Sequence, residues 1–325
     1  MIKTLDLHCD TIVKGHRLNQ PLRDNDLHVS LSKLKQGHAL AQCFAMYISK
    51  QFETAESKTG DPMMERYEEI LACFKQEMAA NSDIVKQALT VDDILENDKN
   101  GYLSAVLTME EGAVVANDIN RLDRFYADGV RIFGLTWNHE NTLGYPNSKD
   151  PDIMAKGLKE FGIEAVERLN KLGIAIDVSH LSDGGFYDVA KYSKKPFFAT
   201  HSNARALCPH IRNLDDRQLR ILGETGSVTG LNFCDIFMRE KGANDPRILP
   251  IDDIIWHAKY IADKAGIDAV AFGSDFDGIT NDLEFKDASG MQMIVDALSR
   301  HFASSQLEKI CYKNALRVLR EVQNV

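Results

Sequence analysis

Eight apolar runs of strand length recur along the 325-residue chain, and stretches with helical periodicity separate most of them. Several runs are rich in Val, Ile and Phe without strict alternation, which is typical of strands buried on both faces of a parallel sheet. The predicted strands cover residues 2–8, 39–48, 103–109, 130–136, 174–179, 196–200, 227–233 and 269–274. Eight strands that alternate with helices favour an α/β fold of the (β/α)8 TIM-barrel type. The competing doubly wound open sheet usually carries a GxGxxG turn, and the sequence contains none.

The helical stretches repeat apolar residues at spacings of three and four. They cover residues 63–78, 117–126, 154–171, 184–192, 215–222 and 252–264. Gly129, Gly173 and Gly226 follow three of these stretches and are expected C-terminal stops. We also expect a helical insertion after the second strand, at 51–101, and closing helices at 304–325. No linker or internal repeat divides the chain, so residues 1–325 are predicted to form one domain.

The composition argues against some classes of binding partner and indicates the cellular compartment of the protein. The net charge is -10 and the charges are well mixed, so nucleic acid and anionic membranes are poor candidates as partners. The six cysteines are scattered without paired spacing, which indicates reduced thiols and a cytoplasmic protein. No apolar run approaches the ~20 residues that span a bilayer, and we expect no leader ahead of the first strand.

Side chains that can bind metal follow most of the predicted strands. His8 and Asp10 follow the first strand and share one face of an extended segment, whereas Cys9 points to the other face. The candidates after later strands are Glu110, Glu111, His139, His180, His201, Asp275 and Asp277. Each alone is most simply a solvated or structural polar residue. Barrel enzymes place their catalytic residues at the carboxyl ends of the strands. Because so many side chains that can bind metal follow successive strands, we expect them to meet at this end of the barrel and form a metal centre. Two metals that share a bridging carboxylate use this many ligands better than one tetrahedral zinc does.

The combined motifs resemble the membrane dipeptidase (renal dipeptidase) family of the amidohydrolase superfamily. They are His8-Cys9-Asp10, Glu111-Gly112, His180, His201-Ser202 and Asp275-Phe276-Asp277-Gly278, with supporting similarity at 27–35, 41–44 and 314–319. The resemblance implies two zinc ions, one bound by His8 and Asp10 and the other by His180 and His201. It also implies that Glu111 and a hydroxide bridge the ions. We expect Glu111 rather than Glu110, because the family's bridging glutamate directly precedes a glycine.

The resemblance assigns roles to further residues. Asp275 would orient the hydroxide and pass a proton to the leaving amine, and Arg212 would bind the terminal carboxylate of the substrate. Trp137 stands where mammalian members carry a histidine that polarises the scissile group. We therefore predict that His139 supplies this contact and that Trp137 forms a wall of the substrate pocket.

The function that the resemblance implies is a binuclear zinc dipeptidase for free dipeptides, which tolerates a D-residue at the C-terminal position and forms a homodimer. The alternative is another hydrolase of the superfamily, acting on a lactone, a cyclic amide or an N-acyl amino acid with the same metal centre. A non-catalytic metal-binding relative is disfavoured, because all expected ligands and Asp275 are present together.

Overall fold

The computed structural model describes residues 1–49, 57–240, 242 and 247–324. Eight parallel strands form a closed barrel, in which β10 pairs with β1 through Asp6 and Phe272. In order around the barrel the strands are β1 (Thr4–Asp6), β2 (Ala39–Tyr47), β4 (Leu103–Glu110), β5 (Val130–Gly134), β6 (Ala175–Asp177), β7 (Phe198–Ala199), β8 (Val228–Leu231) and β10 (Val270–Phe272). The predicted (β/α)8 barrel is confirmed.

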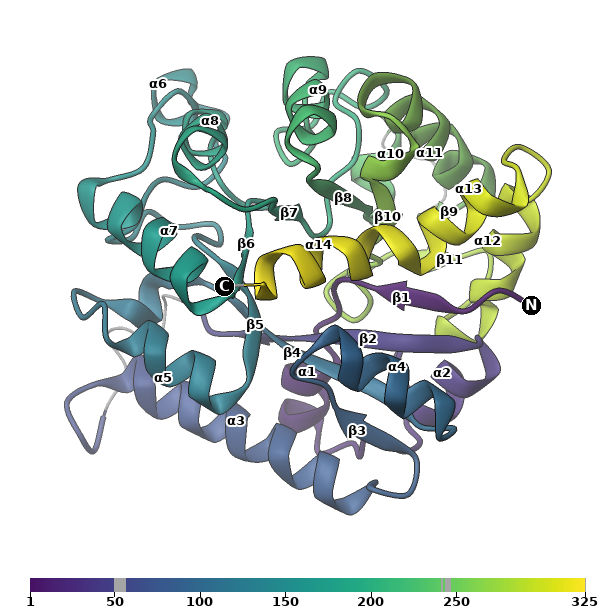
Figure 1. Ribbon diagram of the computed structural model, residues 1–325, viewed down its shortest axis with the longest axis horizontal. Coiled ribbons are helices and arrows are strands. Elements are labelled where there is room, and N and C mark those ends of the chain that lie inside the picture. Colours follow the sequence, from purple (N-terminus) through teal and green to yellow (C-terminus); the bar gives the residue numbers. More distant parts are fainter. Residues whose placement is uncertain (50–56, 241, 243–246, 325) are drawn as a thin grey trace.

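Helices surround the barrel strands (Figure 1). They are α1 (Thr11–Leu18), α2 (Leu31–Gln36), α3 (Pro62–Ala80), α4 (Val91–Lys99), α5 (Arg121–Asp128), α6 (Pro151–Met154), α7 (Glu160–Leu172), α8 (Asp183–Tyr192), α9 (Asp216–Thr225), α10 (Asp235–Met238), α11 (Ile251–Ala265), α12 (Met291–Leu298), α13 (Ser304–Glu308) and α14 (Asn314–Gln323). Short 3-10 turns lie at Gly112–Val115, Ile267–Ala269 and Ala288–Gly290, and a π-helical turn at Lys309–Lys313. Gly129, Gly173 and Gly226 end their helices at φ 103°, 75° and 69°, in the left-handed region where glycine is favoured, so these predicted stops are confirmed.

Two expected elements differ in the structure. The single helix predicted at 154–171 is broken between α6 and α7, because the backbone there bonds to other segments. The N–H of Leu158 donates to the Asp188 carboxylate (2.8 Å), and the N–H of Lys159 donates to the carbonyl of Leu143 (2.9 Å). The insertion predicted at 51–101 is helical in α3 and α4, with 51–56 outside the described residues. It also contains β3 (Val85–Gln87), which pairs with the start of β4 and is too short to show an alternating pattern.

The closing helix α14 lies across one end of the barrel (Figure 1). Its residues Ala315, Val318 and Leu319 are buried in one apolar cluster with barrel residues such as Leu5 and Phe198. The predicted closing helices are therefore confirmed over the described part of 304–325. Because α14 fills this end, the carboxyl ends of the strands at the opposite end remain as the place for a site.

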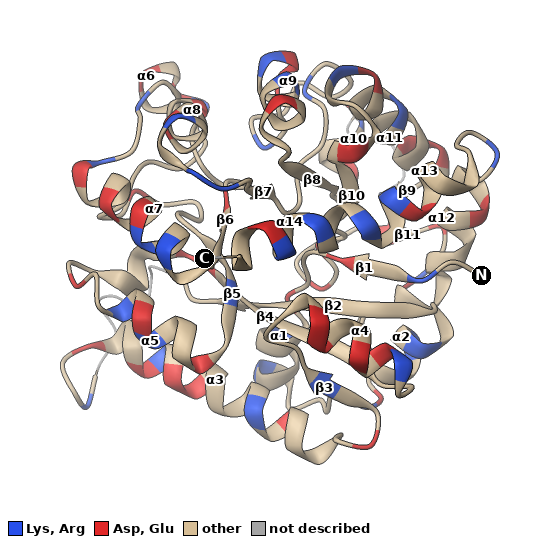
Figure 2. Ribbon diagram, in the orientation of Figure 1, with Lys and Arg blue, Asp and Glu red and all other residues tan. Residues whose placement is uncertain are grey.

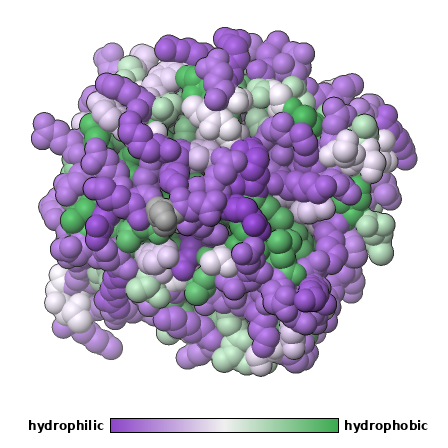
Figure 3. All heavy atoms as spheres, viewed as in Figure 1, coloured by the Kyte–Doolittle hydropathy of each residue, from purple (hydrophilic) through white to green (hydrophobic). Residues whose placement is uncertain are grey.

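The outer surface is mixed in charge and mostly polar. Figure 2 shows acidic and basic residues interspersed along the outer helices, and Figure 3 shows a mainly hydrophilic face with scattered apolar side chains. A two-stranded pair, β9 (Ile248–Leu249) and β11 (Asp282–Leu283), lies apart from the barrel sheet. Among the described residues, every helix is too short or too polar to cross a membrane.

Candidate metal centre and active-site cavity

The segment that follows β1 brings His8 and Asp10 to the carboxyl rim of the barrel. The chain stays extended past the strand because the N–H of Asp10 donates to the Phe276 carbonyl (2.9 Å). The Nε2 atom of His8 lies 3.6 Å from the Oδ2 atom of Asp10, whereas Cys9 is fully buried in the apolar core. The i and i+2 side chains thus lie together and the residue between them points away, as the extended pattern predicted.

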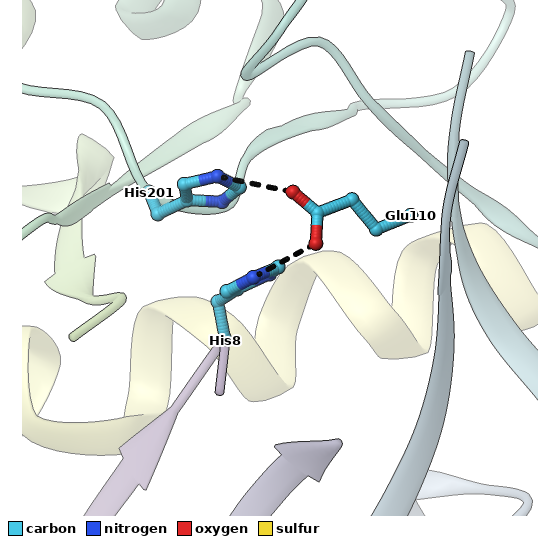
Figure 4. A group of neighbouring side chains, drawn as sticks. All are labelled: His8, Glu110 and His201. Atoms are coloured by element: carbon cyan, nitrogen blue, oxygen red, sulfur yellow. Dashed lines mark ion pairs between the residues drawn. The ribbon is translucent and has the colours of Figure 1, made fainter. Parts of the chain in front are cut away.

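Glu110 is the last residue of β4 and Glu111 follows it, and only Glu110 faces the histidines. Glu110 Oε2 lies 3.4 Å from His8 Nε2, and Glu110 Oε1 lies 3.0 Å from His180 Nε2. Figure 4 shows the Glu110 carboxylate between the rings of His8 and His201. The expectation that Glu111 occupies this place is corrected by the structure.

The backbone explains why Glu111 turns away. Glu111 has φ 117°, a positive value that is rare for a residue with a side chain, so the extended strand ends at Glu110 and Glu111 begins the turn that follows. Its fully buried carboxylate accepts hydrogen bonds from the N–H of Ala113 and from Asn141 Nδ2, both at 2.8 Å. Glu111 therefore ties the end of β4 to the loop after β5.

His180 and His201 follow β6 and β7, and their Nε2 atoms lie 3.0 Å apart. His180 Nδ1 lies 3.0 Å from Asn138 Oδ1, an acceptor, so this ring nitrogen carries the proton. His201 Nδ1 lies 2.7 Å from the Thr200 hydroxyl, which itself donates to the Asp177 carboxylate (2.6 Å). Both rings consequently present an unprotonated Nε2 to the centre, the form that binds a metal.

Asp275 is the third carboxylate near His8, after Asp10 and Glu110. Its Oδ1 atom is 4.0 Å from His8 Nε2, and its Oδ2 atom accepts a hydrogen bond from Asn232 Nδ2 (2.9 Å). Asp275 has φ 61°, in a turn held to the first strand segment by its own N–H, which donates to the His8 carbonyl (3.2 Å). The strained turn directs the carboxylate into the centre rather than along the rim.

Burial and neighbouring charges shift the pKa values of the centre in opposite directions. Burial raises the pKa of Glu110 to about 7 and that of Asp275 to about 6. Burial alone would lower the pKa of His8, but the charges of Glu110 and Asp10 outweigh it and raise this pKa well above its usual value. Burial, with the nearby charges of Arg212 and His8, holds the pKa values of His180 and His201 well below the usual range.

A cavity of about 900 Å³ opens beside these residues. Asp10, Glu110, His180 and Asp275 line this cavity, and so do Trp137 and Asn138 of the loop after β5. The Trp137 ring packs edge-on against Tyr47, with ring centroids 4.8 Å apart. His139, whose ring centroid lies 5.7 Å from that of Trp137, is absent from the described lining.

Arg212 enters the cavity from the loop after β7. Its guanidinium is buried, donates through Nη1 to the Ser179 carbonyl, and places Nη2 3.2 Å from His180 Nε2. A fixed guanidinium beside the candidate metal ligands can bind a carboxylate through two N–H groups. Arg212 lines the cavity, and its expected contact with a substrate carboxylate stays a prediction.

Several supporting residues were not identified from the sequence. Asn138 orients His180, Thr200 orients His201, and Asn232 orients Asp275. Asp6 accepts from Ser274 Oγ (2.6 Å) and from Gln42 Nε2 (2.9 Å), so it joins the end of β1 to β2 and to the segment after β10. The only available signal was their position at the strand ends, and a polar residue there is too common to be diagnostic.

The donor set fits divalent metal ions. Among the described residues, His8 Nε2 is buried without a hydrogen-bond partner, although three carboxylates lie within 4.0 Å of it. The Nε2 atoms of His180 and His201 are both acceptors and face each other at 3.0 Å, with Arg212 Nη2 3.2 Å from that of His180, so this place suits a cation. Two overlapping ligand groups, His8 with Glu110 and His201, and His8 with Asp10 and Asp275, are compact enough to hold an ion.

Comparison with known proteins gives a consistent result. The model of the membrane dipeptidase family (peptidase family M19) matches residues 1–325. A Klebsiella pneumoniae protein of the pqqA 5′ region is 36% identical over 273 residues, which cover 82% of this chain and 99% of the relative. The crystal structure of dipeptidase AC, a metallopeptidase, is 27% identical and superposes with a TM-score of 0.90, covering 100% of this chain and 99% of the other.

A metallopeptidase of Rhodobacter sphaeroides, solved with a phosphinate mimic of the dipeptide L-Ala-D-Ala, is 28% identical with a TM-score of 0.87, and 99% of each chain is covered. The match to the family model covers the whole chain, and the closed barrel agrees with the fold of the dipeptidase structure. The chain therefore belongs to the membrane dipeptidase family and is a metal-dependent hydrolase.

Proposed function

We propose that this protein is a binuclear zinc dipeptidase that hydrolyses the amide bond of free dipeptides. The observation that carries the proposal is the position of Glu110, whose two carboxylate oxygens face His8 on one side and His180 on the other. In the proposal His8 and Asp10 hold one ion, His180 and His201 hold the other, and Glu110 takes the bridging place expected of Glu111. When bound, two zinc ions would lower the pKa of water and polarise the scissile carbonyl.

The chain's own residues would bind the substrate and move the proton. Arg212 would bind the C-terminal carboxylate, since its buried guanidinium lies beside the metal ligands. Asp275, with a pKa raised to about 6 by burial, would take a proton from the attacking water and deliver it to the leaving amine nitrogen. The hydrogen bond from Asn232 would keep its carboxylate in the orientation that both transfers need.

The loop after β5 would shape the pocket. Trp137 would form a wall of the substrate site, supported by its edge contact with Tyr47. The contact from His139 to the substrate carbonyl stays a prediction, and it requires the loop to bring that ring into the cavity. Tolerance of a D-residue at the C-terminal position is supported by the roomy cavity and by the L-Ala-D-Ala mimic bound to the Rhodobacter relative.

The test of this proposal is reconstitution. Protein stripped of metal by a chelator and dialysed should show no dipeptide hydrolysis, and activity should return as zinc is added up to two ions per chain. Full activity with one ion per chain would contradict the binuclear assignment. Matched titrations with manganese and cobalt identify whether zinc is the preferred metal.

A cytoplasmic location and a homodimer are further parts of the proposal. The first is supported by the six free cysteines, five of which are buried. The second rests on the family resemblance, and light scattering on purified protein measures it directly.

A further inference from the structure

The outer part of the cavity is rich in positive charge, although the whole chain is acidic with a net charge of -10. Four cationic residues line it besides the buried Arg212, and they are Lys14, Arg17, Lys149 and Arg247. A cluster of one sign inside a concave site concentrates ligands of the opposite sign. The excess of cations at this opening therefore bears on which substrates enter.

The acidic residues of the lining do not offset these cations. Asp10, Glu110 and Asp275 belong to the candidate metal centre, where divalent ions would neutralise them. Asp277 is buried, and its carboxylate accepts hydrogen bonds from the Thr11 hydroxyl (2.5 Å) and the N–H of His28 (2.8 Å). Of these four acidic residues, Asp277 is the one that lies within 4.0 Å of a cation of the opening, with its Oδ1 atom 3.8 Å from Lys14 Nζ.

Two of the four cations are already engaged, and two are not. Lys14 donates to the Asp277 carbonyl (3.0 Å), and Arg247 donates to both carboxylate oxygens of Asp235 (2.9 and 3.2 Å). Arg17 and Lys149 are exposed, and within the described parts of the chain neither makes an ion pair or a side-chain hydrogen bond. These two side chains are therefore available to a ligand.

The two available cations belong to different segments of the cavity lining. Arg17 lies on α1, which begins directly after Asp10. Lys149 follows Asn147, whose backbone N–H and side-chain amide both donate to the His180 carbonyl, at 2.8 and 3.0 Å. The segments that carry the two available cations thus adjoin Asp10 and His180 of the candidate metal centre.

We propose that the cavity selects dipeptides carrying an acidic side chain, with Arg17 and Lys149 as the residues that determine this specificity. The inference rests on the proposed dipeptidase function and adds the substrate class. The negative charge of a neutral dipeptide is its C-terminal carboxylate, which Arg212 would bind in the proposed function. The extra carboxylate of Asp or Glu is the group that the opening has charge to receive.

The test compares kcat/KM of the zinc-loaded protein for Ala-Glu and Glu-Ala with kcat/KM for Ala-Gln and Gln-Ala, at low ionic strength. Glutamate and glutamine have nearly the same shape, so their ratio isolates the charge. We expect the acidic dipeptide to exceed its glutamine counterpart by about tenfold in at least one of the two orders, the lower end of the effect that charged clefts have on association. The ratio should shrink as salt is added.

The double variant Arg17→Gln/Lys149→Gln should bring this ratio close to one. Arg220→Gln and Lys171→Gln are matched controls, because each removes one exposed cation that does not line the cavity, and they should leave the ratio unchanged. Equal kcat/KM for the Glu and Gln dipeptides, or a ratio that survives in the double variant, would overturn the proposal. Hydrolysis of neutral dipeptides without acidic preference refutes this inference alone, whereas absence of hydrolysis across all dipeptides refutes the proposed function with it.

Discussion

Glu110 and His180 are joined by a 3.0 Å contact between Oε1 and Nε2, while the other oxygen of Glu110 lies 3.4 Å from His8. One carboxylate thus reaches a histidine of each proposed ion site, His180 of one and His8 of the other. The adjacent Glu111 instead bonds to Asn141 and to the backbone of Ala113. We therefore expect substitution of Glu110 to affect metal binding and substitution of Glu111 to affect the stability of the fold.

The substitution Glu110→Gln should abolish metal retention and lower kcat by more than about 100-fold, the upper range for groups that support a metal site. Metal analysis of the purified variants and dipeptide turnover measure both effects. Glu111→Gln is the matched neighbour. It should keep its metal but unfold more easily, by roughly 1–3 kcal/mol, because it weakens buried hydrogen bonds. Loss of metal from Glu111→Gln with retention by Glu110→Gln would reverse our assignment.

Asn138 should matter for metal affinity, although it is not itself placed as a ligand. Its Oδ1 atom accepts from His180 Nδ1 and fixes the ring orientation. We expect Asn138→Ala to weaken binding of one metal ion by about 10- to 100-fold, as measured by competition with a chelator. Asn138→Asp retains the acceptor oxygen and should restore most of the affinity. Equal weakening by both variants would indicate a general packing defect instead.

In the proposed function, Arg212 separates dipeptides from substrates that lack a terminal carboxylate. We expect Arg212→Lys to raise KM for a dipeptide by about 10- to 100-fold, because the paired charge-assisted contact is lost. The same variant should change KM little for a dipeptide amide, whose carboxylate is blocked. If both substrates suffer equally, Arg212 acts by holding Ser179 and His180 in place and not by binding substrate.

Metal binding should release protons near neutral pH. In the metal-free centre, burial raises the pKa of Glu110 to about 7, and the charges of Glu110 and Asp10 raise that of His8 despite its burial. The metal-free state therefore holds more protons than the metal-bound state, so apparent zinc affinity should rise with pH. Calorimetric titrations in buffers of different ionisation enthalpy count the protons. An affinity and heat independent of pH and buffer would contradict these pKa shifts.

The fold and most of the site were predictable because their signals are local. Buried parallel strands leave long apolar runs, and residues such as His8, His180 and His201 stand directly after them. The choice between Glu110 and Glu111 was not predictable in this way, since it depends on a single positive φ angle that directs one side chain inward and the next one outward. The wrong choice came from proximity to Gly112.

Other features depend on contacts between distant segments. The break between α6 and α7 arises because backbone N–H groups there donate to Asp188 and to the carbonyl of Leu143. Neither acceptor belongs to the predicted helix, so the helical pattern of the segment gives no sign of the break. Asn138, Asn232 and Asp6 gain their roles only when separate strand ends meet at the rim. Single polar residues after strands carry no mark that distinguishes such supports from solvated loop residues.

The most direct test of the central claim is release of free amino acid by the zinc-loaded protein from dipeptides in L,L and L,D forms, with a tripeptide included. A cavity that binds the C-terminal carboxylate at Arg212 and the scissile amide at the metals should accept dipeptides of both configurations and leave the tripeptide intact. If protein that holds two zinc ions hydrolyses none of the dipeptides, the proposed function is contradicted. Activity would then be sought on lactones, cyclic amides and N-acyl amino acids.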